Sequence, residues 1–380
     1  MKQKRYICIF LLLAVLFGAA GCSSSQETKF PQEPVESEKG SGYKYYYTQL
    51  DNTEKNAYNA ILEQIEMFPE RIEVPVLTKE QLDEVYTALI YDDPQMFFLG
   101  SDCTIRQSKK RAYFYPNYTM NAEDYSAMLR KCTVVAADIL EEAAAEKTNF
   151  ARERLVHDRL IANCKYNDSK TNSYRGTIYG VLCGGSATCE GYAKTAKYIL
   201  DMLNIPCYVV SGTSTPPGTQ SAAHMWNIVQ IDGDFYHLDL TWDDPVMENG
   251  SNMIRYFYFN VTDSQISKTH SDFETVNACT ATKCSYYVHE RLLFEDFGAA
   301  EKERTVEVAA RVIDAGSDGF CLRFATEKAY GAAQEKLLTQ EGIYDILSKV
   351  QELTDRTFAT DRVSYVCTDE NNSIEFILAQ

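Results

Sequence analysis

The sequence lacks the features that mark nucleic-acid-binding, zinc-stabilised and membrane-spanning proteins. It has 37 Lys and Arg against 54 Asp and Glu, a formal net charge of −17, whereas binding to a phosphate backbone depends on cationic side chains. Its 12 cysteines form no paired C-x-x-C units, so no structural zinc site is expected. The longest apolar run, residues 7–20, is shorter than the ~20 residues of a membrane-spanning helix. No internal repeat is evident, and nucleic acid is not an expected partner.

The N-terminus is instead typical of a secretory signal peptide over residues 1–21. Three basic residues in the first five positions precede the apolar run, which ends in small residues before Cys22. This end resembles a bacterial lipobox, although Ala19 stands where leucine is more usual. We therefore expect secretion across the cytoplasmic membrane, a mature chain that begins at lipidated Cys22, and anchoring of that lipid in the membrane at the bacterial cell surface.

Residues 22–42 are rich in Ser, Glu, Pro and Gly and offer little apolar surface to bury, which predicts a flexible tether. Removal of residues 1–21 would take away three positive charges and change the formal net charge from −17 to −20. We interpret this acidity as a solubility feature rather than as a sign of a basic substrate.

A glycine-rich segment, residues 184–188, leads into apolar positions with helical spacing. Thr188 is a reasonable N-cap, and Asn204 with Pro206 predicts the end of the helix. Cys189 therefore falls in the first turn, where free N–H groups and the helix dipole stabilise an anion. With a nearby imidazolium, such a setting can lower a cysteine pKa from about 8.5 to about 3.5–7.5.

A hairpin is predicted around Asp232 and Gly233, which are flanked on both sides by alternating apolar and polar residues. With a two-residue loop, Trp226 pairs with Asp239, and His224 becomes the diagonal neighbour of Asp239 on the same face. The backbones of diagonal neighbours lie about 7–8 Å apart across the strand pair, which is close enough for these side chains to meet. A slip of one residue would place them on opposite faces.

Cys189, His224 and Asp239 suit acyl transfer as nucleophile, base and orienting acid. An oxyanion site is also needed: the N–H of Cys189 is one candidate donor, and residues 179–185 are a candidate source of a second. Trp226 and Trp242 flank this site as core residues or as walls that exclude water. This chemistry implies no metal and no organic cofactor.

The motifs Tyr-Gly-Val-Leu-Cys-Gly-Gly-Ser-Ala-Thr-Cys-Glu-Gly-Tyr-Ala (179–193), His-Met-Trp-Asn (224–227) and His-Leu-Asp-Leu-Thr-Trp-Asp-Asp-Pro (237–245) resemble the transglutaminase-like superfamily. The resemblance covers residues 150–265. It implies a papain-like α+β fold, in which a helix that carries the cysteine packs on an antiparallel sheet that carries the histidine and the acid. It also implies a catalytic triad of Cys189, His224 and Asp239.

One departure concerns the residues on either side of the nucleophile. In the animal cross-linking enzymes glutamine typically precedes it and tryptophan follows it, whereas Thr188 and Glu190 stand there in this chain. The departure weakens a cross-linking function and favours the peptidase-like bacterial branch.

The rest of the chain predicts a mainly helical region over 43–150, a core over 151–289 and a small α+β domain over 290–380. A capping box at 78–81 and a long apolar pattern over 122–146 indicate helices in the first region, with short strands at 96–99 and 111–115. In the last region we expect a ββαββ unit with strands at 306–312, 320–324, 363–367 and 374–378 and a helix at 327–353.

The remaining cysteines and polar residues have structural interpretations. Cys279 and Cys284 are the best candidates for a local disulfide, and most other thiols are expected to be buried. His157 suits a packing or capping role, and His237 shares the predicted face of Asp239 and could support it. No pattern assigns a role to His270 or His289. Asp243 and Asp244, which precede Pro245, are typical of a turn.

Three functions remain open. The first is a cysteine hydrolase, anchored outside the cytoplasmic membrane, that cleaves peptide or isopeptide bonds through a thioester. The second is an acyltransferase that joins a protein glutamine to an amine. The third is a binding module that keeps the fold without turnover. The expected partner is a protein or peptide substrate, with cell-wall peptide as one candidate.

Overall fold

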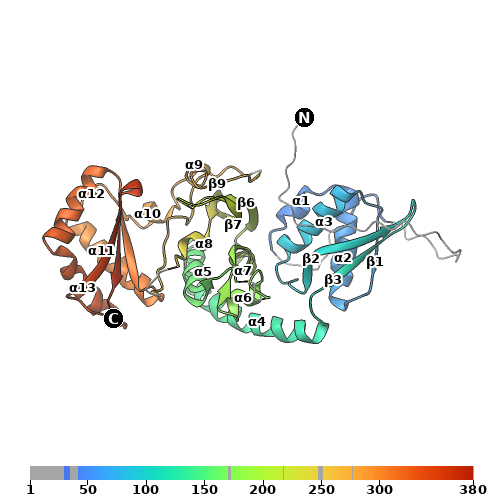
Figure 1. The fold of residues 1–380 in the computed structure, drawn as a ribbon, viewed down its shortest axis with the longest axis horizontal. Helices are drawn as coiled ribbons and strands as arrows, with labels where there is room; N and C mark the ends of the chain where they lie inside the picture. The colour runs from blue at the N-terminus through green and yellow to red at the C-terminus, as the bar shows by residue number, and fades with distance from the viewer. Residues whose placement is uncertain are drawn as a thin grey trace.

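The computed structural model describes residues 30–34, 42–169, 173–216, 218–246, 251–275 and 277–379. The expected signal peptide, Cys22 and most of the tether lie outside the described residues. Within them, no helix is both long and apolar enough to cross a membrane. The described chain forms three units in a row, and the long helix α4 runs along one side of the first and second units (Figure 1).

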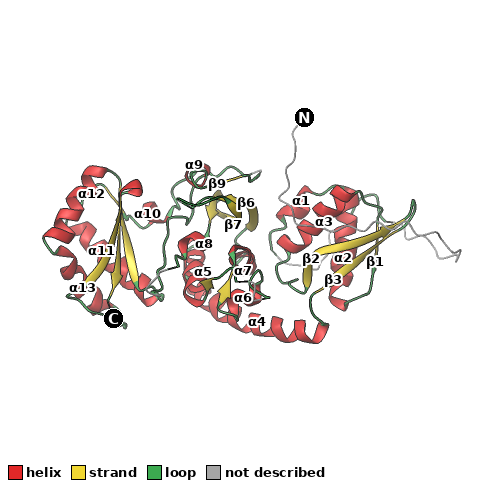
Figure 2. Ribbon diagram, in the orientation of Figure 1, coloured by secondary structure: helices red, strands yellow, loops and turns green. Residues whose placement is uncertain are grey.

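The N-terminal unit packs helices against a three-stranded antiparallel sheet of order β1-β3-β2 (Figure 2). Capping boxes at Asp51 and Thr78 begin α2 and α3, the second as predicted. The expected strand at 96–99 is wrong, because Met96 and Leu99 close a turn and the strand begins only at Leu99. The elements are α1 (Tyr45–Gln49), α2 (Asn52–Gln64), a 3-10 turn (Ile65–Met67), β1 (Ile72–Val74), α3 (Lys79–Asp92), β2 (Leu99–Gln107) and β3 (Ala112–Tyr118).

The central unit packs helices against an antiparallel sheet of order β8-β7-β6-β9. Its helices are α4 (Ala122–Ala145), α5 (Asn149–Asn163), α6 (Ile178–Leu182), α7 (Cys189–Met202), α8 (Leu240–Asp243) and α9 (Asp263–Ile266). Its strands are β4 (Lys165–Tyr166), β5 (Ser186–Ala187), β6 (Cys207–Ser214), β7 (Ala222–Ile231), β8 (Asp234–Leu238) and β9 (His270–Ser271). The fold is the predicted α+β arrangement, with the cysteine helix α7 beside the sheet.

Helix α7 ends as the sequence predicts, because Asn204 takes a left-handed conformation with φ 56° just before Pro206. A buried lysine in α7 ties this helix to two other segments. Lys197 Nζ donates to Asp201 Oδ2 at 2.7 Å, to the carbonyl of Tyr43 at 2.9 Å and to that of Cys207 at 3.1 Å. All three ammonium protons therefore have acceptors, which satisfies a charge that would be costly to bury alone.

The C-terminal unit has a four-stranded sheet of order β10-β11-β13-β12, with helices packed beside it (Figure 2). The pair β10–β11 is parallel and the other two pairs are antiparallel. The elements are α10 (Tyr286–His289), β10 (Leu293–Phe294), α11 (Ala299–Asp314), β11 (Gly319–Phe324), α12 (Glu327–Gln334), a π-helical turn (Glu335–Thr339), α13 (Gly342–Leu353), β12 (Val363–Thr368), a 3-10 turn (Asp369–Asn371) and β13 (Ser373–Leu378).

The predicted ββαββ order of this unit is wrong. Residues 306–312 lie in helix α11 and not in a strand. The apolar residues of this stretch also occur at the spacing that places them on one face of a helix. The alternation of Val306, Val308, Ala310 and Val312 imitates a strand. The helix predicted over 327–353 is interrupted before Gly342, and the three strands predicted after residue 319 are present.

Cys279 and Cys284 do not form the expected local disulfide. All ten cysteines of the described residues are free thiols, and six of them are buried. Cys279 packs in a small cluster with Trp226 and Tyr208, whereas Cys284 packs in the main core. The two side chains therefore pack in different clusters although they are only five positions apart in sequence.

Candidate active site

Cys189 is the first residue of α7, so its N–H and those that follow have no acceptor within the helix. Thr188 is the N-cap as predicted, but its side chain makes no capping hydrogen bond. The carbonyl of Arg175 fixes the helix start instead, since it accepts the N–H of Thr188 at 3.0 Å. The same carbonyl would lie only 2.4 Å from a Cβ at Gly191, which explains the glycine there.

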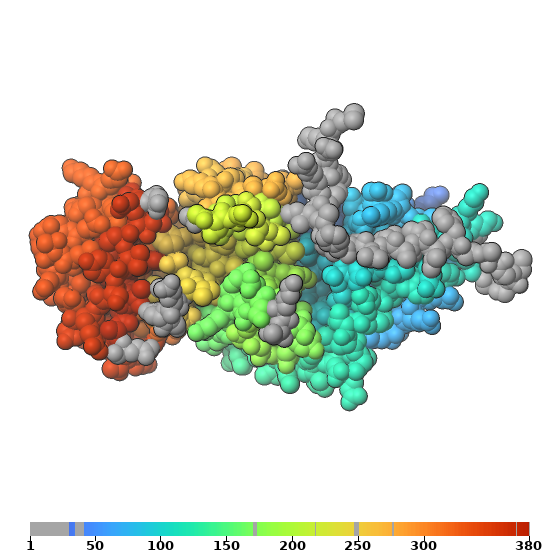
Figure 3. All heavy atoms as spheres, viewed as in Figure 1, coloured from blue at the N-terminus to red at the C-terminus, as the bar shows by residue number. Residues whose placement is uncertain are grey.

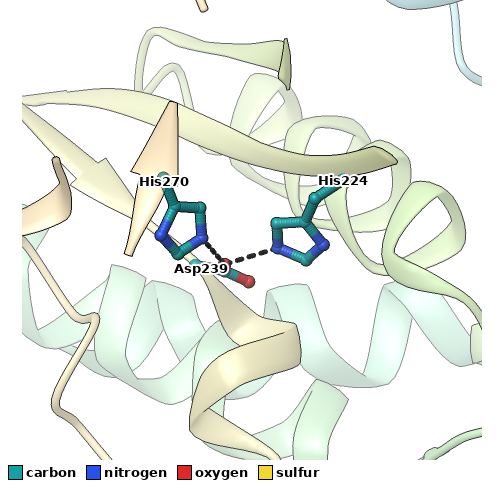
Figure 4. A group of neighbouring side chains, drawn as sticks. All are labelled: His224, Asp239 and His270. Carbon is teal, nitrogen blue, oxygen red and sulfur yellow. Dashed lines mark hydrogen bonds and ion pairs between the residues drawn. The ribbon is translucent and has the colours of Figure 1, made fainter. Parts of the chain in front are cut away.

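The hairpin has the predicted register. Ile231 pairs with Asp234 and Asn227 with Leu238, and Asp232 and Gly233 form the loop with φ of 52° and 91°. Two left-handed residues in succession make a primed turn that matches the twist of the strands. The same register continues to Asp239, the residue after β8, and places it beside His224 on β7 (Figure 4).

Asp239 is fully buried and accepts four hydrogen bonds. Its Oδ1 accepts the N–H groups of Thr241 at 3.0 Å and Trp242 at 3.2 Å, which caps helix α8. Its Oδ2 accepts Nε2 of His224 at 2.7 Å and Nε2 of His270 at 3.0 Å (Figure 4). Burial alone would raise the pKa of Asp239, but these partners hold it far below the ordinary value. The carboxylate is therefore ionised.

His224 connects this carboxylate to Cys189. Burial lowers the pKa of the imidazole, but the charge of Asp239, its hydrogen bond and the adjacent Cys189 thiol raise the pKa to about 10. Because Nε2 is bonded to Asp239, Nδ1 is the nitrogen left for the thiol. The structure thus brings the three predicted residues together in the predicted order.

Both tryptophans lie where the sequence placed them. Trp226 is buried, with its ring centre 5.8 Å from that of His224. Trp242 lies 6.3 Å from His224 and 4.8 Å from His270. The two indoles therefore enclose both imidazoles and limit their contact with water.

Two residues near the site were not predicted. His270 reaches Asp239 from the short strand β9, and sequence patterns gave it no role. Tyr91 comes from α3 of the N-terminal unit, and its hydroxyl lies 3.9 Å from Sδ of Met225. Burial, together with the charges of Glu190 and Cys189, raises the pKa of Tyr91 well above its usual range. The N-terminal unit, to which no chemistry was assigned, therefore contributes to the surroundings of Cys189.

His237 does not support Asp239 by a hydrogen bond, contrary to the prediction. Its Nδ1 accepts the indole N–H of Trp226 at 3.0 Å, so in the neutral ring Nε2 carries the proton and donates to Asp263 at 2.9 Å. Burial lowers the pKa of His237, which favours this neutral form. Cys279 completes a group of possible metal ligands here, but a protonated nitrogen has no lone pair to offer, and burial raises the pKa of the Cys279 thiol to about 12.

His224, Asp239 and His270 also have the composition of a metal site. Around a tetrahedral ion with bonds of about 2.0 Å, neighbouring ligand atoms lie about 3.3 Å apart. The distances from Asp239 Oδ2 to the two nitrogens, 2.7 and 3.0 Å, are those of direct hydrogen bonds. The arrangement therefore fits a hydrogen-bonded network and not a metal site.

Asp243 and Asp244 are more than turn residues, which corrects the prediction. Asp243 is fully buried, accepts the N–H of Tyr258 at 3.0 Å and pairs with Nε2 of His157 at 3.3 Å. Asp244 accepts the hydroxyl of Tyr192, which lies on α7. These bonds tie the segment after Asp239 to helices α5 and α7. His157 has the structural role that was expected.

The predicted second oxyanion donor is not provided by Cys183 or Gly184. Both N–H groups bond the carbonyl of Tyr179, at 3.0 and 2.9 Å, which closes the end of α6. The N–H of Cys189 remains the donor at the start of α7.

A cavity of about 300 Å³ lies elsewhere, between the central and C-terminal units. Aromatic residues of both units and Arg323 line it, and none of Cys189, His224 and Asp239 does. In the space-filling view the central unit, in green and yellow, packs directly against the C-terminal unit in orange and red (Figure 3).

The His224–Asp239 pair makes a definite contribution to stability as a function of pH. The pKa of His224 is raised from 6.5 to about 10, so its contribution is complete below pH 6.5 and is lost as the pH rises toward 10. Asp239 has a lowered pKa, so its contribution is lost as the pH falls below 3.8. We predict that the difference in unfolding free energy between wild type and His224→Gln is largest from pH 4 to 6.5 and shrinks above it. Chemical denaturation across this range checks it, and a difference that stays constant up to pH 10 would contradict it.

Comparison with known proteins identifies the central unit. Residues 136–240 match the sequence model of the family described as the transglutaminase-like superfamily, and this match contains Cys189, His224 and Asp239. No curated protein sequence matches the chain significantly.

Solved structures with some similarity include a TGase, with 16% identity, a TM-score of 0.26 and coverage of 49% of this chain and 58% of that one. A candidate cysteine protease from Cytophaga hutchinsonii has 14% identity and a TM-score of 0.25, with coverage of 34% and 52%. The periplasmic domain of TgpA from Pseudomonas aeruginosa has 18% identity and a TM-score of 0.24, with coverage of 35% and 56%. The chain thus spans little more than half the length of each. Residues 136–240 of the chain thus match the transglutaminase-like superfamily.

Proposed function

We propose that the chain is a cysteine hydrolase that cleaves peptide or isopeptide amide bonds outside the cytoplasmic membrane. The observation that carries this proposal is the continuous arrangement of Cys189, His224 and Asp239. A thiol at a helix start adjoins an imidazole, whose other nitrogen bonds a buried carboxylate at 2.7 Å. This is the arrangement that an activated thiol nucleophile requires.

In the first half-reaction the Cys189 sulfur attacks the amide carbonyl carbon, and His224 delivers its Nδ1 proton to the leaving amine. The C–N bond breaks, the amine departs, and the acyl group remains on sulfur as a thioester. In the second half-reaction His224 takes a proton from water as the water oxygen attacks the thioester carbonyl carbon. The C–S bond breaks, a carboxylic acid departs, and Cys189 sulfur and protonated His224 return to their starting state. Asp239 keeps the Nε2–H tautomer of His224 in place through both steps.

Charge on the carbonyl oxygen develops next to the start of α7. As the first residue of the helix, Cys189 has an N–H without an acceptor in the helix, and the dipole of the 14-residue helix favours negative charge there. Glu190, the next residue, is paired with Lys194 at 2.7 Å, which reduces the effect of its negative charge on the thiolate.

Water is the proposed acceptor because the residues beside Cys189 are Thr188 and Glu190. A primary amine would attack the same thioester and give a new amide, so the transfer reaction differs from hydrolysis only in what reaches the sulfur. The substrate class that we propose is protein or peptide, with cell-wall peptide as a candidate. The support for an extracytoplasmic location is the sequence of residues 1–22.

The proposed reaction predicts that the full-length protein releases free amine and carboxylate from peptide or isopeptide substrates. Product mass spectrometry in the presence of a labelled primary amine separates hydrolysis from transfer. Cys189→Ala is expected to abolish either product, and Asp239→Asn to lower the rate by about 10³- to 10⁴-fold through the wrong tautomer.

The matched control is Cys367→Ala, which removes an exposed thiol from strand β12, outside the central unit, and should leave the rate unchanged. An amide with the label would replace the hydrolase proposal with acyl transfer. Equal rates for Cys189→Ala and wild type would contradict both and leave a binding module.

The proposed anchor is tested with Cys22→Ser. In the bacterial host, wild type should partition with membranes and take up labelled fatty acid. The reason is that the described residues contain no helix that could cross the membrane, so anchoring would depend on the lipid. The variant should lose the label. A variant that still incorporates the label, or a wild type without it, would overturn the lipid anchor and leave the reaction proposal unaffected.

A further inference from the structure

His270 makes a contact that the proposed reaction does not require. It is fully buried on β9, and its Nε2 donates to the same Oδ2 of Asp239 that accepts the proton of His224. The two imidazoles approach this oxygen from opposite sides, as Figure 4 shows, with ring centres 5.2 Å apart. Because both N–H donors share this one oxygen, each of them reduces the attraction of the carboxylate for the other.

The other nitrogen of His270 fixes its orientation. Nδ1 lies 2.9 Å from the hydroxyl of Thr269, which lies 3.2 Å from the hydroxyl of Tyr258. With Nε2–H donating to the ionised carboxylate, a neutral ring accepts at Nδ1 from the hydroxyl of Thr269, whose oxygen can then accept from Tyr258 and also lies 3.4 Å from the carbonyl of Ile266. Burial raises the pKa of Tyr258 to about 12, which keeps this hydroxyl protonated and able to donate.

We propose that His270 is a positioning residue of this site, which holds Oδ2 of Asp239 beside the His224 ring and takes a share of its negative charge. The inference rests on the proposed function, because it concerns how the proposed base is held. His270 itself touches neither Cys189 nor a substrate. It acts through Asp239, whose other oxygen is already held by the start of α8.

The consequence concerns the proton on His224. With two donors on Oδ2, Asp239 stabilises the His224 imidazolium less than it would with one. Without the His270 donor, the carboxylate would hold the His224 proton to a higher pH, and His224 would become a poorer acid toward a leaving amine. His270 thus keeps the base in a working range.

Other ionisable groups that face His270 are few. They are His237 on β8, which interacts with it electrostatically, Asp239, which accepts its proton, His224, which bonds the same carboxylate, and Tyr258, whose ring centre lies 5.6 Å away. On its own segment Lys268 and Asp272 are exposed to solvent, where their effect is screened.

The test reads the charge of His224 through two alkylating agents. Iodoacetate carries a negative charge that an adjacent imidazolium attracts, and iodoacetamide carries none, so the ratio of their rates at Cys189 falls as His224 loses its proton. Peptide-resolved mass spectrometry on the full chain gives this ratio from pH 5 to 11. The variants are His270→Phe, which keeps a ring without donors, and His270→Gln, which returns an N–H.

His237→Gln is the matched control, because His237 is equally buried in the same sheet, on β8, and makes no hydrogen bond to Asp239. We expect His270→Phe to move the midpoint of the ratio upward by about half to one pH unit, and His270→Gln to return it toward wild type. The control should leave it in place even where it lowers the melting temperature. If His270→Phe fails to fold, Thr269→Val, which removes only the hydroxyl partner, should give a smaller upward movement.

A midpoint that no His270 or Thr269 variant moves would overturn this inference while leaving the reaction proposal intact. The same holds if His270→Phe and His270→Gln give equal shifts, because a structural role of the ring would then explain them. A wild type in which the ratio never exceeds that of the other cysteines would overturn the reaction proposal and this inference together.

Discussion

The structure of the site depends on one buried carboxylate. Asp239 receives four N–H donors, two from the start of α8 and one each from His224 and His270. An ionised group without such partners would be very costly to bury, so the strands and helix that supply the donors must keep their places together. The hairpin register, the cap of α8 and the short strand β9 are therefore all needed to supply the donors of Asp239.

The surrounding units add to this constraint. Lys197 joins the cysteine helix to the carbonyl of Tyr43, at the beginning of the N-terminal unit, and Tyr91 of that unit lies near Cys189. The site is therefore enclosed by residues on both sides of the family match, which covers only residues 136–240. The segment after Asp239 is held in turn by Asp243 and Asp244, which contact α5 and α7.

Local pattern was sufficient for the parts of the site that lie on one helix or one hairpin. The helix of Cys189 and the register that joins His224 to Asp239 followed from spacing and turn chemistry, because both are set within a few residues. His270 lies 31 positions after Asp239 in the sequence, and Tyr91 belongs to another unit, so no periodicity could place either. The residues of helix α11 were predicted as a strand because valines at alternate positions suit the two-residue period of a strand as well as a helix.

The central claim is that His224, which adjoins Cys189, activates its thiol. The most direct measurement is the rate of alkylation of Cys189 as a function of pH, compared in one digest with the other described cysteines and repeated in His224→Ala. The account predicts rapid labelling of Cys189 well below pH 8, where an unpaired thiol with a pKa of about 8.5 reacts slowly, and much slower labelling in the variant. Labelling of Cys189 that is no faster than that of the other exposed thiols, and indifferent to His224, would contradict it.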